Sequence, residues 1–384
     1  MNGKKKLFIP GPVDVEEEVL LESAKPLINH RGEEFHELFE DVKRKLKEVL
    51  STKNEVVLLT ASGTGAVEAL AANFAPGKRA LVVNAGEFGS RLAEALRVYG
   101  AEVLEVTAEL GSAPDLETVI SQMDTFKPEV VAFVYNDTSP GVRLSYAEEL
   151  SREAKSRGAL VLVDAVSAVG GDELRVEAWG IDALAGASQK CLEAPPGLSF
   201  VVLGEEARER LPKEAKSVYF DLRRYLEYSA KSETPFTPAV TLLYAFRRAL
   251  EKVLSFGVEK WISMHAVRAA ALYRAFQALG LTPFVKEKYR SRTVLSFTAP
   301  TGVNSVELRR ALSEKYGIEI AGGLGKLREK VVRVGLMGYV PLRDLVALVA
   351  AVGLELKERG LKVDLDESLS ELSKLASAYE DFQA

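Results

Sequence analysis

The sequence predicts an α/β protein with a large unit, in which helices sandwich a mostly parallel seven-stranded sheet, and a smaller C-terminal α+β unit. Two observations predict this arrangement. Short apolar runs rich in β-branched residues alternate with amphipathic segments, which is typical of strand–helix–strand units. After about Pro238 the alternation gives way to long helices and a second, shorter set of strands. A chain of 384 residues, 47% of them hydrophobic, is long enough for two such units.

The large unit contains seven apolar runs short enough to be buried strands. We expect these strands at Val56–Thr60, Ala80–Asn84, Val103–Val106, Val130–Tyr135, Leu160–Asp164, Ala183–Ala187 and Ser199–Leu203. The segments between them carry apolar residues at helical spacing. We expect helices at Thr64–Phe74, Gly89–Tyr99, Leu116–Met123 and Tyr146–Arg157. The strand–helix order therefore predicts a sheet covered on both faces.

The second unit follows a different pattern, in which helices dominate. We expect helices at Thr241–Leu254, Val258–Leu279, Ser305–Tyr316 and Leu342–Arg359, and strands at Arg292–Thr298 and Val331–Gly335. The last twenty residues are expected to form a surface helix with a frayed end. The predicted division is an N-terminal segment (residues 1–14), a large domain (15–255) and a small C-terminal α+β domain (256–384).

The charge balance and cysteine content exclude several classes of function. Fifty basic and 55 acidic side chains give a net charge of −5, which argues against nucleic acid as a partner. The single cysteine cannot form an intramolecular disulfide. There is no secretory signal and no apolar stretch of 18 residues, so we expect a cytoplasmic protein with no membrane segment.

Two residues point to pyridoxal phosphate (PLP) chemistry. Lys190 lies 26 positions after Asp164, which ends the apolar run Ala159–Val163. A lysine amine can form a Schiff base with the PLP aldehyde, and a carboxylate can keep the pyridine nitrogen protonated so that the ring acts as an electron sink. A surface lysine and an aspartate that caps a turn are both common, so this pair alone leaves the structural interpretation open.

A candidate phosphate site follows the first strand. In Ser62-Gly63-Thr64-Gly65, small residues let backbone N–H groups approach a phosphate at a helix N-terminus, and the hydroxyls of Ser62 and Thr64 can add hydrogen bonds. An ordinary glycine-rich turn with a threonine cap is an equal alternative. The segment is neither a Walker loop nor a dinucleotide fingerprint, since the residues that define those motifs are absent.

Three further strand ends carry residues that could line a ligand crevice. Phe88 could stack on a flat cofactor, or it could be a core anchor. Thr138 could donate to the cofactor phenolate oxygen, or it could belong to a capped turn. Val166, two residues after Asp164, could lie against the ring face opposite Phe88.

Two later segments complete the candidate site. A long helix follows Thr234-Pro235-Phe236-Thr237-Pro238. The hydroxyl of Thr237 could cap that helix, or it could reach a phosphate in its own or a neighbouring subunit. Arg333 stands alone in an apolar strand. Its planar fork suits a substrate carboxylate, although a pair with an internal acid would also explain it.

Taken together, these residues resemble the class V, fold-type I aminotransferases, and more narrowly the serine–pyruvate / alanine–glyoxylate aminotransferase group. The resemblance spans essentially the whole chain. It runs through Pro10-Gly11-Pro12, Ser62-Gly63-Thr64-Gly65, Val163-Asp164-Ala165-Val166, Ser188-Gln189-Lys190 with Ala194-Pro195-Pro196-Gly197, and Arg333-Val334-Gly335. The Gln-Lys…Ala-Pro-Pro-Gly segment is the most specific part.

The resemblance implies a role for each candidate residue. Lys190 carries the cofactor as a Schiff base and shuttles a proton, while Asp164 pairs with the pyridine nitrogen. Phe88 stacks on the ring and Thr138 contacts its 3′-oxygen. The phosphate is held by Gly63, Thr64 and Gln189, with Thr237 and Thr234 added from the other subunit. Arg333 binds the substrate carboxylate and Gly11 lines a small substrate pocket. Thr234 departs from relatives that carry tyrosine there.

The predicted function is a PLP-dependent transaminase. By a ping-pong route it would move an amino group from serine or alanine to glyoxylate or pyruvate, in a homodimer with shared active sites and no metal. A cysteine desulfurase is a weaker alternative, since that class needs a mobile cysteine and usually a histidine before the lysine. Here Gln189 precedes Lys190, the only cysteine is Cys191, and Phe88 stands where those enzymes stack a histidine. Other amino donors, and a non-enzymatic binding protein, are further alternatives.

Overall fold

The computed structural model describes residues 4–376 and 379, and it confirms the predicted fold class. The large sheet has seven strands in the order β2-β10-β9-β8-β5-β3-β4. Their bounds are β2 (Glu55–Leu59), β3 (Arg79–Asn84), β4 (Glu102–Thr107), β5 (Val130–Val134), β8 (Leu160–Asp164), β9 (Ala183–Ala187) and β10 (Ser199–Leu203). All neighbouring strands are parallel except at β10, which is antiparallel to both β2 and β9.

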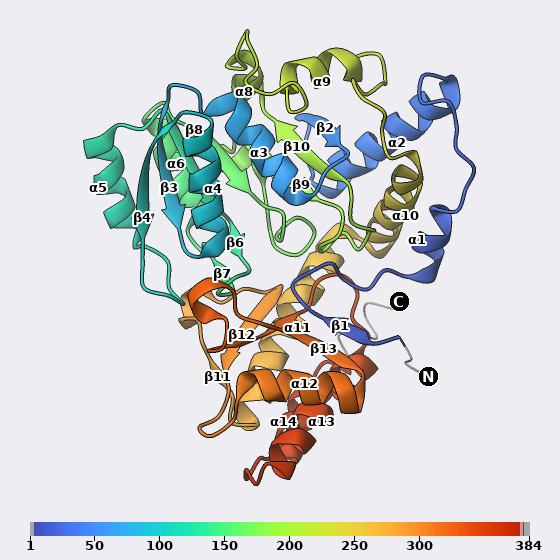
Figure 1. Ribbon diagram of the computed structural model, residues 1–384, viewed down its shortest axis with the longest axis vertical. Helices are drawn as coiled ribbons and strands as arrows, with labels where there is room; N and C mark the ends of the chain where they lie inside the picture. The colour runs from blue at the N-terminus through green and yellow to red at the C-terminus, as the bar shows by residue number, and fades with distance from the viewer. Residues whose placement is uncertain (1–3, 377–378, 380–384) are drawn as a thin grey trace.

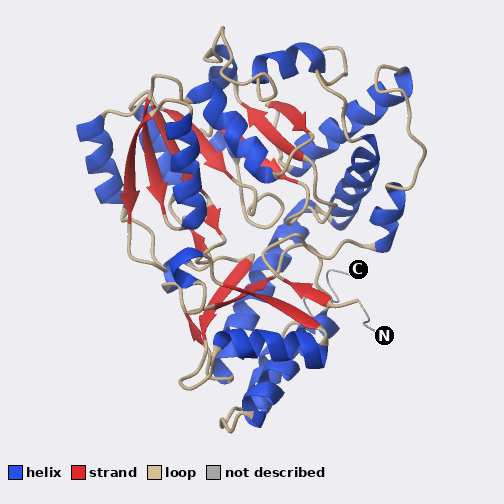
Figure 2. Cartoon of the chain, viewed as in Figure 1, coloured by secondary structure: helices blue, strands red, loops and turns tan. Residues whose placement is uncertain are grey.

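Helices cover both faces of this sheet, as Figure 2 shows. One face packs on α2 (Glu33–Val49), α5 (Leu116–Phe126), α6 (Ala147–Ser156) and α10 (Val240–Phe256). The other face packs on α3 (Gly63–Phe74) and α4 (Glu87–Val98). Successive residues of a strand point to opposite faces. In β5, Val131 and Phe133 therefore enter the first core, while Val130 and Ala132 enter the second.

The smaller sheet has five strands and includes the N-terminal strand. Its order is β1 (Lys6–Phe8), β13 (Ile318–Gly322), β14 (Val332–Gly335), β12 (Val294–Thr298) and β11 (Thr282–Pro283). β1 is parallel to β13, and the other pairs are antiparallel. Figure 1 shows β1 at the edge of the small sheet. The residues that follow it contact the large unit, since the Pro10 carbonyl accepts from Lys190 and Gly11 packs on the same side chain.

Three helices pack beneath the small sheet, and one helix joins the two cores. The three are α12 (Ser305–Tyr316), α13 (Leu342–Glu358) and α14 (Leu365–Ser373). The expected C-terminal helix is found as α14, and residues 377–378 and 380–384 lie outside the described residues. The joining helix α11 (Val258–Ala278) places Trp261 and Met264 in the core of the large unit and Leu272 and Phe276 in the core of the small one. The domain limits at residues 14 and 255 stay a prediction.

The remaining elements are short. They are α1 (Glu17–Glu22), β6 (Asn136–Asp137), β7 (Val142–Arg143), α7 (Val176–Trp179), α8 (Glu205–Glu209), α9 (Leu222–Ser229) and two 3₁₀ turns at Glu287–Tyr289 and Gly325–Leu327. The β6–β7 hairpin follows β5, and its residue Val142 forms an isolated bridge with Arg290, four residues before β12.

Candidate active site

A cavity of about 420 Å³ lies at the carboxyl ends of β5 and β8, where an open parallel sheet normally binds its ligand. Its lining contains most of the residues that the sequence analysis selected. They are Ser62, Gly63, Thr64, Phe88, Thr138, Asp164, Val166, Gln189 and Lys190. Segments more than a hundred residues apart in the sequence are thus brought together around one space.

Lys190 presents its amine beside the N-terminal segment. Its Nζ donates a hydrogen bond to the carbonyl oxygen of Pro10. A Cβ added at Gly11 would lie only 2.7 Å from this Nζ, and Gly11 has a φ of +95°, so only glycine fits there. Burial lowers the pKa of the Lys190 ammonium, and Arg333 lowers it further while Asp164 opposes the shift. The environment therefore makes this amine easier to deprotonate than an exposed lysine.

Asp164 lies at the end of β8 with its carboxylate only partly satisfied. Oδ1 accepts a hydrogen bond from the Val166 N–H at 2.9 Å, so the turn-cap interpretation holds for that oxygen. Within the described chain no donor pairs with Oδ2, and no cation lies within salt-bridge distance. Burial raises the pKa of this carboxyl to about 6, and nearby Asp137 adds to the rise. One carboxylate oxygen is thus available to a cationic or donor group in the cavity.

The opposite end of the cavity is the N-terminus of α3. The first N–H groups of a helix have no partner within it, and the Ser62 side chain does not cap this one. The hydroxyl-bearing residues Ser62 and Thr64 are both exposed to the cavity side, whereas Gly63 is buried. A Cβ at Gly63 would approach both Val166 methyl groups to 2.9 Å. Close backbone approach, helix polarity and hydroxyls together suit a phosphate.

Phe88 and Val166 are both half-buried and line the same cavity. The N-terminus of α4, which carries Phe88, is fixed by the fully buried Asp137, whose Oδ2 accepts from the Gly89 N–H at 3.0 Å. Within the described chain no hydrogen-bond partner is found for the Thr138 hydroxyl. The side-chain set can therefore hold a flat ring with one polar substituent.

Arg333 reaches from β14 to the large unit. Its Nε donates to the Gly322 carbonyl and its Nη1 to the Thr138 carbonyl, both at 2.7 Å. No carboxylate of the described chain lies within salt-bridge distance, so the internal-acid alternative is not what is found. Burial lowers the pKa of Arg333 to about 10, which leaves it charged at neutral pH. Its Nη2 has no partner among the described residues and is free for an anion.

Thr234 and Thr237 do not line the cavity. The Thr234 hydroxyl donates to the Phe236 carbonyl at 2.8 Å, and the Thr234 carbonyl accepts from Arg31 at the same distance. Thr237 is exposed on the surface. Within a single chain neither hydroxyl is placed to hold the phosphate, so a role for them requires a second subunit.

The only cysteine is unsuited to a catalytic role. Cys191 is fully buried, its thiol lies 3.8 Å from the Ser167 carbonyl, and burial raises its pKa to about 12. A reactive cysteine needs an accessible thiolate. This removes the main requirement of the desulfurase alternative.

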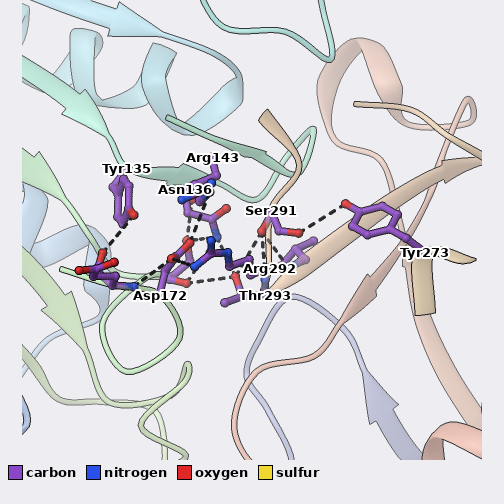
Figure 3. Close-up of polar contacts among 11 residues, drawn as sticks. Tyr135, Asn136, Arg143, Asp172, Tyr273, Ser291, Arg292 and Thr293 are labelled. Atoms are coloured by element: carbon purple, nitrogen blue, oxygen red, sulfur yellow. Dashed lines mark hydrogen bonds and ion pairs between the residues drawn. The ribbon is translucent and has the colours of Figure 1, made fainter. Parts of the chain in front are cut away.

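The sequence analysis did not select Asn136, which also lines the cavity. Its Nδ2 donates to the hydroxyls of Thr293 at 2.8 Å and Ser167 at 3.0 Å, as Figure 3 shows. Beside it lies Asp172, held by Arg292 at 2.9 Å and Arg143 at 3.6 Å. We call these six residues the polar junction. Asn136 stands in the polar segment after β5, but position alone could not separate it from its neighbours.

The site fits the predicted cofactor. The α3 N-terminus suits a phosphate, the free oxygen of Asp164 suits a protonated ring nitrogen, and Lys190 supplies an amine. The amide oxygen of Gln189 is buried without a partner among the described residues, so no hydrogen bond of the protein holds that oxygen in place. These donors and acceptors have the polarity that a phosphorylated pyridine aldehyde requires.

A model of the family "Aminotransferase class-V" matches residues 16–348. Among curated relatives, an uncharacterized aminotransferase of Methanocaldococcus jannaschii is 39% identical over 94% of each chain. The alanine–glyoxylate aminotransferase of Drosophila melanogaster is 30% identical, covering 94% of this chain and 95% of the relative.

Solved structures give the same result. The ureidoglycine–glyoxylate aminotransferase of Bacillus subtilis superimposes with a TM-score of 0.91 at 29% identity, with 98% of each chain covered. The aspartate aminotransferase of Thermus thermophilus has a TM-score of 0.84 at 36% identity, covering 91% of this chain and 99% of that one. Among the described residues, no helix is both long and apolar enough to cross a membrane.

Proposed function

The chain belongs to the class V aminotransferase family, and we propose that it transfers the amino group of serine or alanine to glyoxylate or pyruvate. The observation that carries the proposal is a pair of groups. The Lys190 amine lines the cavity, and Arg333, which is outside the lining, donates to the carbonyl of the cavity residue Thr138 and keeps Nη2 without a partner among the described residues. A substrate with one amino group and one carboxylate matches this pair.

The cofactor is pyridoxal phosphate, which when bound supplies an electron sink for the negative charge that develops at the substrate Cα. We assign its phosphate to Ser62, Gly63, Thr64 and Gln189, and its ring nitrogen to Asp164. Phe88 and Val166 would enclose the ring, and the Thr138 hydroxyl would donate to the ring oxygen.

The chain's own groups then divide the remaining work. The pKa of Lys190 is lowered by burial. Its amine can take a proton from the Cα of the amino donor, and in the second half-reaction it can give a proton to the Cα that derives from the oxo acid. Arg333 holds the carboxylate, which fixes the Cα–H bond relative to Nζ. Because one arginine serves both substrates in turn, donor and acceptor compete for one site, as a ping-pong route requires.

We propose a homodimer with shared sites. Thr237 is exposed, and Val98, which lines the outer end of the cavity, is 75% exposed. A second subunit would cover this apolar side chain and bring its own Thr237 toward the phosphate. Two-fold dimers are the commonest soluble assembly. A cofactor-loaded monomer that is fully active in sedimentation and activity measurements would refute this assignment.

A donor–acceptor panel tests the function. Each candidate amino acid is mixed with the cofactor-loaded protein, and the cofactor absorbance is followed in the first half-reaction. Each oxo acid is then tested in the return half-reaction. Serine or alanine with glyoxylate or pyruvate should give the highest kcat/KM. If none of these compounds changes the spectrum, the proposed substrates are wrong.

An acidic donor such as aspartate is a second candidate. Arg309 on α12 forms no hydrogen bond or ion pair within the described chain, and its buried Nε has no partner. Its guanidinium packs on Gly322, where an added Cβ would lie 2.9 Å from Cζ, and its charge lowers the pKa of Arg333. A second carboxylate could use this cation. In the panel, a preference for aspartate that is lost in Arg309→Ala would favour this candidate.

A further inference from the structure

Three buried polar side chains form one stripe along α11, and none of them touches the cavity. Trp261, His265 and Arg268 are spaced four and three residues apart, so they lie on the same face of the helix. All three are fully buried. Each side chain forms hydrogen bonds with main-chain atoms. Those that reach beyond α11 go to two segments. These segments are the turn that follows Lys190 and the loop Leu336–Val340, which follows the strand of Arg333.

The first contact fixes the lysine turn. The Trp261 Nε1 donates to the carbonyl of Cys191, the residue next to Lys190, at 3.0 Å. Within that turn, the N–H of Glu193 donates to the Lys190 carbonyl at 3.0 Å. The helix therefore holds the main chain on the C-terminal side of the catalytic lysine.

The other contacts fix the arginine loop. Arg268 Nη2 donates to the carbonyls of Gly338 at 2.7 Å and Leu336 at 3.1 Å, and Nη1 lies 3.5 Å from that of Val340. His265 accepts from the Gly338 N–H at 3.1 Å while its Nδ1 contacts the Trp261 carbonyl at 2.8 Å. Burial lowers the pKa of His265 well below its usual value, so the ring is neutral and its Nε2 can accept.

Arg268 has no carboxylate within salt-bridge distance in the part of the chain that is described. A buried guanidinium without an ion pair needs other acceptors, and the loop carbonyls supply them for Nη1 and Nη2, while the buried Nε has no hydrogen-bond partner among the described residues. The loop is thus wrapped around a cation. One further contact closes the ring of interactions, because the Tyr339 N–H donates to Glu193 Oε2 at 3.3 Å.

We infer that Arg268 and His265 are positioning residues, which through the loop Leu336–Val340 set the place of Arg333 relative to Lys190. This inference rests on the proposed carboxylate role of Arg333. The amine and carboxylate subsites belong to different units of the fold, and α11 is the helix that packs in both cores. Its polar stripe ties the two subsites together at main-chain level.

The test compares Arg268→Met with Arg268→Lys in the cofactor-loaded enzyme. Arg268→Met keeps the side-chain length but leaves the loop carbonyls unpaired, so the loop should shift. We expect the KM for the amino donor to rise roughly tenfold to hundredfold, since a displaced arginine loses its charge-assisted hydrogen bond. The kcat at saturation, the cofactor content and the absorbance spectrum should change little. Arg268→Lys should raise the donor KM less than Arg268→Met does.

Two further variants keep the inference testable if Arg268→Met does not fold. His265→Leu removes one bond to the loop and should raise the same KM by a smaller factor. Arg274→Met is the matched control, because Arg274 lies on the same helix but pairs with Glu371 away from the site. It should leave the KM unchanged.

The inference fails if Arg268→Met and His265→Leu lower kcat and thermal stability together while the donor KM stays at the wild-type value. Such a result would make the stripe purely structural. A wild-type enzyme that transaminates no amino acid would instead overturn the proposed function, so the two failures are distinguishable.

Discussion

Asp164 and Asp172 lie eight residues apart and are both buried, yet their surroundings differ. Asp172, in the polar junction, is held by Arg292 and Arg143 and accepts the Glu173 N–H at 2.9 Å. Asp164, in the cavity, has a single backbone donor at Oδ1 and no cation in salt-bridge distance within the described chain. Burial raises the pKa of both carboxyls. Only Asp172 has cationic partners in the described chain, of which Arg292 forms a hydrogen bond and Arg143 an ion pair without one.

The difference supports the proposed division between a structural acid, Asp172, and an acid that would meet the cofactor, Asp164. A satisfied carboxylate stabilises the contact between segments, here between the large unit and the strand that begins near Arg292 (Figure 3). An unsatisfied buried carboxylate is costly to the folded protein and is explained when a ligand supplies the missing partner. Arg333 and Arg268 repeat part of this contrast. Arg333 has no partner for Nη2 among the described residues, whereas both Nη atoms of Arg268 meet loop carbonyls and only its buried Nε lacks a partner.

Replacing the cavity amine should have the largest effect. Lys190→Ala should abolish transamination in a folded protein, because loss of a positioned proton-transfer group alone typically costs ~10²–10⁴-fold in rate. Turnover with alanine and glyoxylate measures the loss, and circular dichroism checks the fold. Lys78→Ala, which removes an exposed lysine that pairs with Glu129 at 2.8 Å, is a control for the general loss of a lysine. Full turnover by Lys190→Ala would contradict the site assignment.

The two aspartates should respond in opposite ways to the same substitution. Asp164→Asn should lose most of the rate of the first half-reaction with little loss of stability, because a neutral amide cannot hold the ring nitrogen protonated. Asp172→Asn should keep that rate but lose about 1–3 kcal/mol of unfolding free energy, since its arginines lose a charged acceptor. Stopped-flow absorbance and denaturant titration measure the two quantities. If both variants lost the same half-reaction rate and the same unfolding free energy, the proposed difference between the two aspartates would be wrong.

The free nitrogen of Arg333 should determine carboxylate recognition. A hydrogen bond to a charged group contributes about 1.5–3 kcal/mol, so Arg333→Ala should raise the KM of amino acid and oxo acid together. Arg333→Lys should raise both KM values less than Arg333→Ala does, but still above wild type, because a lysine ammonium lacks the planar fork of arginine. The comparison is kcat/KM for alanine against ethylamine. If the preference for alanine survives in Arg333→Ala, another cation binds the carboxylate.

The smallest effect is on stability as a function of pH. The pKa of Asp164 is raised from 3.8 to about 6 in the folded protein, so between these values the native state binds more protons than the unfolded state. Its stability therefore falls as pH rises through this window. Cofactor-free Asp164→Asn should match wild type below pH ~4 and exceed it by at most about 3 kcal/mol above pH ~6. A constant difference across the range would mean that Asp164 is not titrating.

Much of the fold was predictable because its strands are continuous apolar runs. The sequence analysis missed α2, although Phe35, Phe39, Val42 and Leu46 follow a helical spacing, since charged residues fill the other positions. It also missed β13, a short segment whose pairing with β1 joins the two ends of the chain. Pairing between distant segments leaves no local pattern.

The candidate site was predictable where chemistry and position coincide in one motif. Lys190, Asp164 and the Ser62–Gly65 turn each stand at a strand end or a helix start, and one cavity contains them all. The sequence does not show whether a buried carboxylate has hydrogen-bond donors or cations around it. Asp172 looks as suitable as Asp164 until Arg143 and Arg292 are found beside it, from segments on either side of it in the chain. The same holds for Arg268 and the loop carbonyls.

The most direct test of the central claim is to find which lysine carries the cofactor. The cofactor-loaded protein is reduced with borohydride, digested and mapped by mass spectrometry. The account predicts a single modified peptide, with the label on Lys190, and its disappearance when an amino donor converts the enzyme before reduction. A label on another lysine, or none, would contradict the claim that this cavity is the active site.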